Sequence, residues 1–192
     1  KKKFSKDENL RLLYVSTVKK YKHQWNLIDA VGLLRKEGTP IELHLVGGGD
    51  SQALNLMQDA ILRNKLEKNF IFHHGSLPYK ETLEWYHKAD IFVFPSTCET
   101  FGISLLEAMT AGLPIASSDR GPMPEVLKDA GLFFNPESVT SIKNCLRYMI
   151  ENPNLLQSLG AKAKQYSQAY SWKKCADETF AFLSSVYEKN RK

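Results

Sequence analysis

Short, continuously apolar runs alternate along this chain with longer segments of helical periodicity. Runs without a polar residue at every second position indicate strands that are buried on both faces. Such strands form parallel sheets, in which helices make the crossover connections and cover both faces. The alternation therefore predicts an α/β fold, a Rossmann-like doubly wound parallel sheet of about six strands with helices on both faces.

The boundaries of these elements follow from the apolar patterns and from Gly and Pro at their ends, as at Gly112 and Pro114. Strands are predicted at residues 10–15, 41–46, 70–72, 90–94, 114–117 and 131–134. Helices are predicted at residues 24–35, 54–61, 80–88 and 102–111, and from 136 to the end with breaks near 152–153 and 170–171.

The length and composition favour one globular domain. The chain has 192 residues, of which 43% are hydrophobic and 24% charged, and this apolar content excludes intrinsic disorder. No run approaches the length of a membrane-spanning helix. We predict that residues 1–9 are a linker or an artificial chain end, and that residues 10–192 form the domain, with its last helices at 153–190. The start of the chain lacks the pattern of a signal peptide.

Charge and cysteine content exclude two kinds of site. The net charge of +5 comes mainly from lysines at the chain ends and around residues 19–22, which does not predict a nucleic-acid interface. Cys98, Cys145 and Cys175 are widely separated, and no Cys-x-x-Cys pair occurs. We therefore expect neither a metal site nor a disulfide framework, as in a reducing cytoplasm.

The predicted topology gathers five loops at one edge of the sheet. In open α/β sheets, ligands bind beyond the carboxyl ends of the strands. The loops after Val15, Val46, Phe72, Phe94 and Ser117 should open at this edge.

Two carboxylates and a glycine follow the strand that ends at Phe94. Glu99 lies in the loop, and Gly102 precedes a helix whose first amides have no intrahelical acceptor and suit a phosphate group. Glu107 lies on an otherwise apolar helix, where a carboxylate needs a partner such as a ribose hydroxyl. Taken singly, Glu99 also fits a solvated loop residue, and Glu107 fits a structural carboxylate that accepts a bond from a neighbouring amide.

The stretch PSTCETFGISLLEAMTAGLPIASS, with its Glu-x7-Glu spacing, resembles the signature of the family 4 (group 1) retaining glycosyltransferases, which have the GT-B fold. YVSTVKKYKHQWNLIDAV, LHLVGGG, FHHGSLPYKETLEWYHKADIFVFPS and GPMPEVLKDAGLFFNP also resemble segments of that family. The resemblance covers roughly residues 10–188 and only the C-terminal, donor-binding half of the fold. It implies that 10–192 is a nucleotide-sugar-binding domain.

The resemblance also implies roles for individual residues. Glu99 would hold hydroxyls of the donor sugar, Glu107 would take the ribose hydroxyls, and Lys22 would neutralise the diphosphate leaving group. Residues around the sugar and diphosphate would include Thr100, Phe101, Gly102 and Ile103, and residues near the base would be Gly75, Ser76 and Leu77. The catalytic residues would be Glu99 and Lys22.

One position departs from the family pattern. The family usually has Arg five residues before the lysine that matches Lys22, whereas Thr17 stands there in this chain. A threonine offers a hydrogen bond but no charge. Lys19, Lys20 or a partner domain would then replace the missing cation, and the alternative is that both lysines are merely exposed.

We expect a retaining, metal-independent hexosyltransferase that needs no cofactor and uses a UDP-, GDP- or ADP-sugar as its donor. The acceptor would be a lipid-linked glycan or a polysaccharide, as in polysaccharide or lipopolysaccharide biosynthesis. The partner would be the missing N-terminal acceptor-binding domain, without which the chain would be inactive. The enzyme would be cytoplasmic. A peripheral location at the inner face of the membrane is the alternative. The alternatives are a non-catalytic nucleotide-binding module and a nucleotide-sugar 2-epimerase of similar fold.

Other polar and glycine-rich segments carry weaker signals. Residues 47–49, three consecutive glycines, favour a plain turn with one glycine lining the cleft. The five histidines show no metal-ligand spacing, which favours structural roles for most of them. His73 and His74 should point to opposite faces of a strand.

Overall fold

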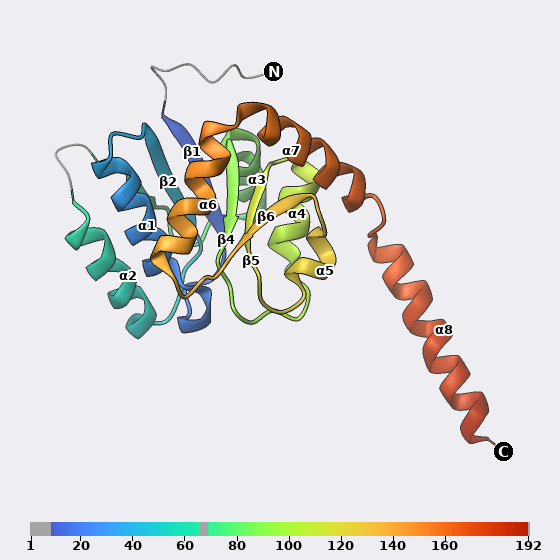
Figure 1. The fold of residues 1–192 in the computed structure, drawn as a ribbon. Helices are drawn as coiled ribbons and strands as arrows, with labels where there is room; N and C mark the ends of the chain where they lie inside the picture. The colour runs from blue at the N-terminus through green and yellow to red at the C-terminus, as the bar shows by residue number, and fades with distance from the viewer. Residues whose placement is uncertain (1–8, 66–68, 192) are drawn as a thin grey trace.

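A computed structural model describes residues 9–65 and 69–191 of the chain (Figure 1). Residues 1–8 of the predicted linker lie outside this described part. The described residues form one six-stranded sheet in the order β3-β2-β1-β4-β5-β6, with every neighbouring pair parallel. The predicted Rossmann-like sheet is thus confirmed. The strands are β1 Leu10–Val15, β2 Ile41–Val46, β3 Ile71–His73, β4 Ile91–Phe94, β5 Ile115–Ser118 and β6 Gly131–Phe134.

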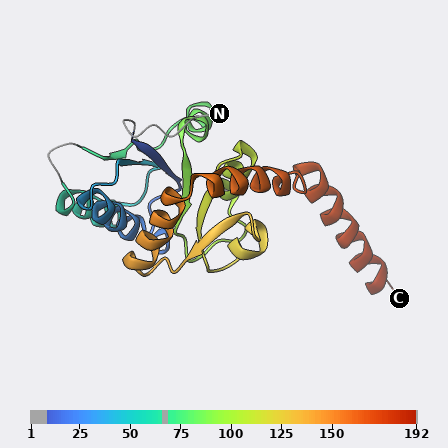
Figure 2. The ribbon, with the colours of Figure 1, turned by 45° about the horizontal axis from the view of Figure 1, so that its top comes forward.

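Helices cover both faces of the sheet (Figures 1 and 2). On one face α1 packs against α2 and α6, while α3 and α4 pack together on the other. The helices are α1 Gln24–Lys36, α2 Ser51–Arg63, α3 Tyr79–Lys88, α4 Ile103–Ala111, α5 Met123–Leu127, α6 Val139–Glu151, α7 Pro153–Ser167 and α8 Trp172–Asn190. The predicted breaks near 152–153 and 170–171 separate α6 from α7 and α7 from α8.

The strand order reverses between β1 and β4, which makes this point the topological switch of the sheet. There Leu12 of β1 pairs with Ile91 of β4, and both side chains are fully buried. The two strands therefore form the buried centre of the sheet. The loops that leave their carboxyl ends diverge from this point, which is where open α/β sheets bind ligands.

Two short helices were not predicted from the sequence. The 3₁₀ helix η1, Lys20–Lys22, follows β1, and α5 follows β5. A turn of three residues carries too little periodicity to detect. The five residues of α5 are likewise too few, and Pro124 lies in its first turn.

The last helix, α8, extends away from the sheet (Figures 1 and 2). All of its residues are exposed, including Trp172, Phe180 and Leu183. No described helix is long and apolar enough to cross a membrane.

Candidate functional site

The loops at the carboxyl edge of the sheet are joined by backbone hydrogen bonds. After β1, the amide of Ser16 donates to the carbonyl of Val46 over 2.9 Å, and the amide of Val18 donates to that of Gly48 over 2.7 Å. The amide of Gly47 donates to the carbonyl of Gly75 over 2.7 Å. The loops after β1, β2 and β3 therefore form one continuous backbone surface.

The glycines after β2 are required by the close approach of these loops. A Cβ atom on Gly47 would lie 2.0 Å from the carbonyl oxygen of Ser16, and one on Gly49 would lie 2.4 Å from that of Val18. Gly47 also has a φ of 135°, which L side chains rarely adopt. The predicted plain turn is thus a tightly packed junction between loops.

Lys22 and Glu99 form an ion pair at this edge. Lys22 is the last residue of η1, whereas Glu99 lies in the loop between β4 and α4. The two side chains are 9% and 14% exposed, so the pair is largely shielded from water. The structure thus brings together the two residues that the sequence resemblance marks as catalytic, although they lie 77 positions apart.

Aromatic side chains surround the Lys22 ammonium group. Its Nζ atom lies 5.2 Å from the centre of the Tyr21 ring and 5.8 Å from that of Phe94. The buried Tyr14 hydroxyl donates to the Lys22 carbonyl over 3.1 Å, and burial raises the pKa of Tyr14. Tyr14 therefore stays a neutral donor that fixes the backbone carrying Lys22.

The loop that carries Glu99 is fastened to η1. The amide of Thr97 donates to the carbonyl of Tyr21 over 2.8 Å, and the Thr97 hydroxyl donates to the same carbonyl over 3.1 Å. The hydroxyl of Ser96, fully buried, donates to the Cys98 carbonyl over 3.2 Å. These bonds set the distance between the chain segments that hold Lys22 and Glu99.

The residues that depart from the family pattern lie at the same edge. Thr17 is exposed, and its carbonyl accepts a bond from the Gln24 amide over 3.0 Å. Lys19 pairs with Asp50 at the start of α2, with 2.9 Å between Nζ and Oδ2, and this bond raises the pKa of Lys19. Lys20 is exposed. Whether either lysine replaces the family arginine stays a prediction.

Helix α4 begins as predicted. Gly102 caps it with a left-handed backbone, φ 87°, and no side chain caps its first amides. Glu107, in the second turn, accepts a bond from the Tyr86 hydroxyl of α3, with 2.8 Å between the oxygens. Burial raises the pKa of Tyr86, so that it remains a donor. Glu107 thus has a side-chain donor from the adjacent helix, and the ribose role assigned to it stays a prediction.

The remaining predicted residues follow β3, or lie between β4 and the first turn of α4. Thr100, Ile103 and Ser76 are exposed, whereas Gly75 and Leu77 are half-buried. The ring of Phe101 packs edge-on against that of Tyr170, which follows α7, with 5.3 Å between centres.

Sequence reasoning missed the tyrosines that support the candidate site, Tyr14 behind Lys22 and Tyr86 beside Glu107. Tyr14 and Tyr86 resemble ordinary core aromatics, and their hydroxyl contacts depend on the tertiary structure. The position of His23 in the sequence could have marked it as a candidate, because it stands between Lys22 and Gln24, the first residue of α1. The expectation of structural roles agrees with His44, whose ring stacks on that of Phe72.

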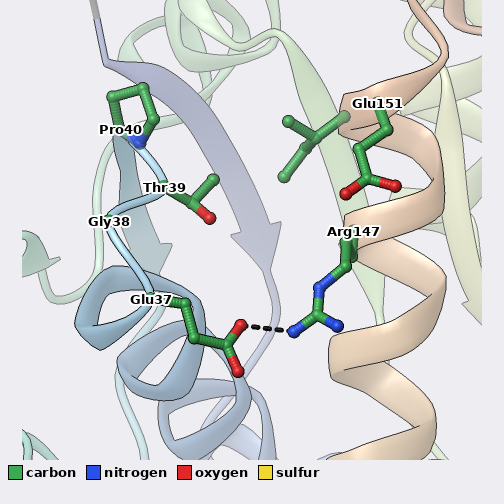
Figure 3. Close-up of a pocket in the computed structure, with 7 residues that line it drawn as sticks. Glu37, Gly38, Thr39, Pro40, Arg147 and Glu151 are labelled. Atoms are coloured by element: carbon green, nitrogen blue, oxygen red, sulfur yellow. Dashed lines mark hydrogen bonds and ion pairs between the residues drawn. The ribbon is translucent and has the colours of Figure 1, made fainter.

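A separate hollow of about 570 Å³ lies at the opposite, amino edge of the sheet (Figure 3). It lies between the end of α1 and α6, where the Glu37 carboxylate pairs with the Arg147 guanidinium (Figure 3). None of the residues predicted for the site lines this hollow, whose lining residues are Glu37, Gly38, Thr39, Pro40, Arg147, Ile150 and Glu151.

The sequence matches the family described as glycosyl transferases group 1 over residues 1–166. The chain belongs to this family. This group 1 glycosyltransferase chain is 29% identical over 171 residues to one relative, the O-antigen chain mannosyltransferase B of Escherichia coli. The match covers 87% of this chain and 44% of that protein. The chain is 28% identical over 160 residues to the sulfoquinovosyl transferase of Arabidopsis thaliana, covering 70% and 31%. The chain thus spans less than half the length of these curated relatives.

Solved structures show the same fold. The Anabaena protein HepE, in complex with UDP and glucose, matches 93% of this glycosyltransferase chain with 49% of its own, at a TM-score of 0.82 and 22% identity. The C-terminal domain of a group 1 glycosyltransferase from Francisella tularensis matches 84% of this chain with 85% of its own, at a TM-score of 0.74 and 22% identity. The domain therefore has the fold of the C-terminal half of a GT-B glycosyltransferase.

Proposed function

We propose that this domain binds the nucleotide-sugar donor of a retaining, metal-independent glycosyltransferase. The observation that carries the proposal is the shielded ion pair of Lys22 and Glu99 at the topological switch of the sheet. A donor would present its diphosphate to Lys22 and its sugar hydroxyls to Glu99. The anionic diphosphate would pair with the Lys22 ammonium group, and the hydroxyls would donate hydrogen bonds to the Glu99 carboxylate. The family membership of the chain supports this reading.

In this mechanism, Lys22 supplies the fixed positive charge that the departing nucleoside diphosphate requires. Low exposure strengthens the interaction, because little water competes for the ammonium group. Glu99 would orient the sugar as charge develops at the anomeric carbon. The amides that begin α4 after Gly102 have no side-chain cap and would donate hydrogen bonds to phosphate or sugar oxygens.

The acceptor site would come from an N-terminal domain that the chain lacks. The GT-B proteins that match this chain are about twice its length, which supports a second half in the complete enzyme. We propose that the complete enzyme transfers a hexose to a glycan or lipid-linked hydroxyl. We further propose that this domain binds the donor without transferring the sugar.

Calorimetric titration with UDP-glucose, GDP-mannose and ADP-glucose, and with UDP, GDP and ADP, tests the proposal. We expect one base to bind, and we expect Lys22→Ala to weaken both the nucleotide and its sugar conjugate by about tenfold or more. Glu99→Ala should chiefly remove the difference in affinity between the conjugate and the nucleotide. His87→Gln, an exposed change on α3, is the control. Equal affinity in the wild-type chain and both site variants would refute the proposal.

A further inference from the structure

His23 stands between η1 and α1 in an unusual conformation. Its φ of 51° is left-handed, and His23 and Lys128 are the non-glycine residues of the described chain with positive φ. A left-handed residue other than glycine costs roughly 1 kcal/mol or more and persists where its surroundings hold it. The imidazole of His23 does not cap α1, so its side chain is engaged elsewhere.

Hydrogen bonds on both ring nitrogens determine the protonation state of His23. The Asn26 amide nitrogen, Nδ2, lies 3.3 Å from Nδ1 of the ring and also donates to the carbonyl of Pro136 over 2.9 Å. Because an amide NH₂ group can only donate, Nδ1 must accept and carry no proton. The proton of the neutral ring then lies on Nε2, which donates to the Thr97 hydroxyl oxygen over 3.2 Å.

The bonds form one directed chain across three loops. The Thr97 hydroxyl in turn donates a hydrogen bond to the Tyr21 carbonyl, so every donor in the chain of bonds has an acceptor. Pro136 belongs to the loop between β6 and α6, Thr97 to the loop between β4 and α4, and Tyr21 to η1. Thr97 precedes Glu99 by two residues, and Tyr21 adjoins Lys22.

We propose that His23, as the neutral Nε2–H tautomer, is a positioning residue that holds the Glu99 loop against Lys22 for donor binding. This inference rests on the donor-binding role proposed above for Lys22 and Glu99. The hydrogen bonds of the His23 ring go to Asn26 and Thr97, not to Lys22 or Glu99. His23 acts through Thr97, so its loss would change donor affinity without removing either charged group.

Protonation of the ring would break this arrangement. A proton on Nδ1 would face the Asn26 amide, and turning that amide over would abandon its bond to Pro136. Burial lowers the pKa of His23, and the Glu137 carboxylate partly opposes this shift. The groups around the ring are Tyr21 and Lys22 of η1, Trp25 and Asn26 of α1, Thr97 before α4, and Pro136 and Glu137 before α6.

Two variants remove the hydrogen bond between His23 and Thr97, one at each of its ends. His23→Gly keeps a residue that accepts the left-handed backbone, and Thr97→Val removes the acceptor while retaining the side-chain shape. We expect each to raise the dissociation constant of the bound sugar conjugate, among UDP-glucose, GDP-mannose and ADP-glucose, by about tenfold. The double variant should lose less than the sum of the two single losses, because both variants lack the His23–Thr97 bond, although Thr97→Val also removes the bond to the Tyr21 carbonyl. His87→Gln should bind like the wild type.

Two further readouts separate positioning from general stabilisation. A two-bond ¹H–¹⁵N correlation spectrum should show His23 as the neutral Nε2–H tautomer at pH 7.5. As the pH falls from 7.5 toward the range in which this ring gains a proton, wild-type affinity should fall more than that of His23→Gly, which has no imidazole at this position. The sugar conjugates suit this series, since their phosphodiester groups carry no proton in that range.

The outcomes distinguish this inference from the proposed function. If Lys22→Ala weakens binding while His23→Gly binds within twofold of the wild type, His23 does not position the site and only this inference fails. A neutral His23 ring that carries its proton on Nδ1 instead of Nε2 would overturn this inference as well. If Lys22→Ala and Glu99→Ala also leave the affinity unchanged, or if none of the three conjugates binds, the donor-binding role fails and this inference fails with it.

Discussion

At the scale of single residues, the site depends on one shielded pair of opposite charges. Lys22 and Glu99 are both largely removed from water, so each ion needs the other to offset its lost hydration. A pair of this kind adds little net stability compared with apolar residues of similar volume. Its presence at the topological switch therefore fits a binding role better than a structural one.

Breaking the pair should destabilise the fold, and removing both charges should restore most of the loss. We expect Glu99→Leu to lower the free energy of unfolding by about 3 kcal/mol, because it leaves the Lys22 ammonium uncompensated. The double variant with Lys22→Met should come within about 1 kcal/mol of the wild type. Urea unfolding of the four proteins measures this cycle. A single-variant cost below about 0.5 kcal/mol would mean that water solvates the pair.

A second residue-scale prediction concerns His44 and His74. Their rings share a hydrogen bond of 3.0 Å between Nδ1 and Nε2, and both lie tilted against the Trp85 ring. Burial lowers the pKa of both imidazoles below the value of about 6.5 in the unfolded chain. The unfolded chain therefore binds more protons as the pH falls, so acidification lowers the free energy of unfolding.

Urea unfolding at pH 7.5 and 5.5 measures this effect. We expect lower stability at pH 5.5, and a smaller loss in His74→Phe, which keeps an aromatic ring beside Trp85 but cannot bind a proton. His87→Gln, an exposed histidine change, should retain the wild-type dependence. Equal losses in the wild type and His74→Phe would place the pH dependence elsewhere, His23 being another imidazole whose pKa burial lowers.

At the scale of elements, the packing of the loops at the carboxyl edge sets the shape of the site. Gly47 and Gly38 both have a positive φ, but a Cβ atom would meet the Ser16 backbone only at Gly47. Gly38 has open space around it, at the end of α1. The two glycines therefore separate the cost of backbone strain from the cost of a steric clash.

Substitution by alanine at each position makes this comparison. We expect Gly38→Ala to cost about 1 kcal/mol, from the left-handed backbone alone. Gly47→Ala should cost at least about 2 kcal/mol more, because the loops after β1 and β2 must separate. It should also weaken nucleotide binding, whereas Gly38→Ala should not. Equal costs at both sites would show that the loops can move apart freely.

The sequence patterns located these elements better than they located the contacts of the site. Runs such as 10–15 and 41–46 become strands with the predicted bounds, because continuous apolar burial leaves few alternatives. The 3₁₀ turn before His23 and the five residues of α5 were missed, since neither completes a helical period. The Tyr14 and Tyr86 hydroxyl bonds each join two different elements, β1 to η1 and α3 to α4, so the periodicity within an element cannot predict them.

At the scale of the whole molecule, the domain is the C-terminal half of a GT-B fold. Its sheet is complete, and its buried apolar side chains come from strands and helices along most of the described chain. A domain with its own core can fold and bind a ligand by itself. Donor binding and sugar transfer are therefore separable activities, and the first can be measured on this chain.

The most direct measurement is a thermal unfolding panel of the chain with UDP, GDP, ADP and their sugar conjugates. A ligand at about one hundred times its dissociation constant stabilises the folded state by about 2.7 kcal/mol. In a domain of this size that raises the midpoint temperature by about 5–10 °C. We predict such a shift with the nucleotides of one base, and its loss in Lys22→Ala. A flat panel, or an equal shift in Lys22→Ala, would contradict a donor site built around Lys22 and Glu99.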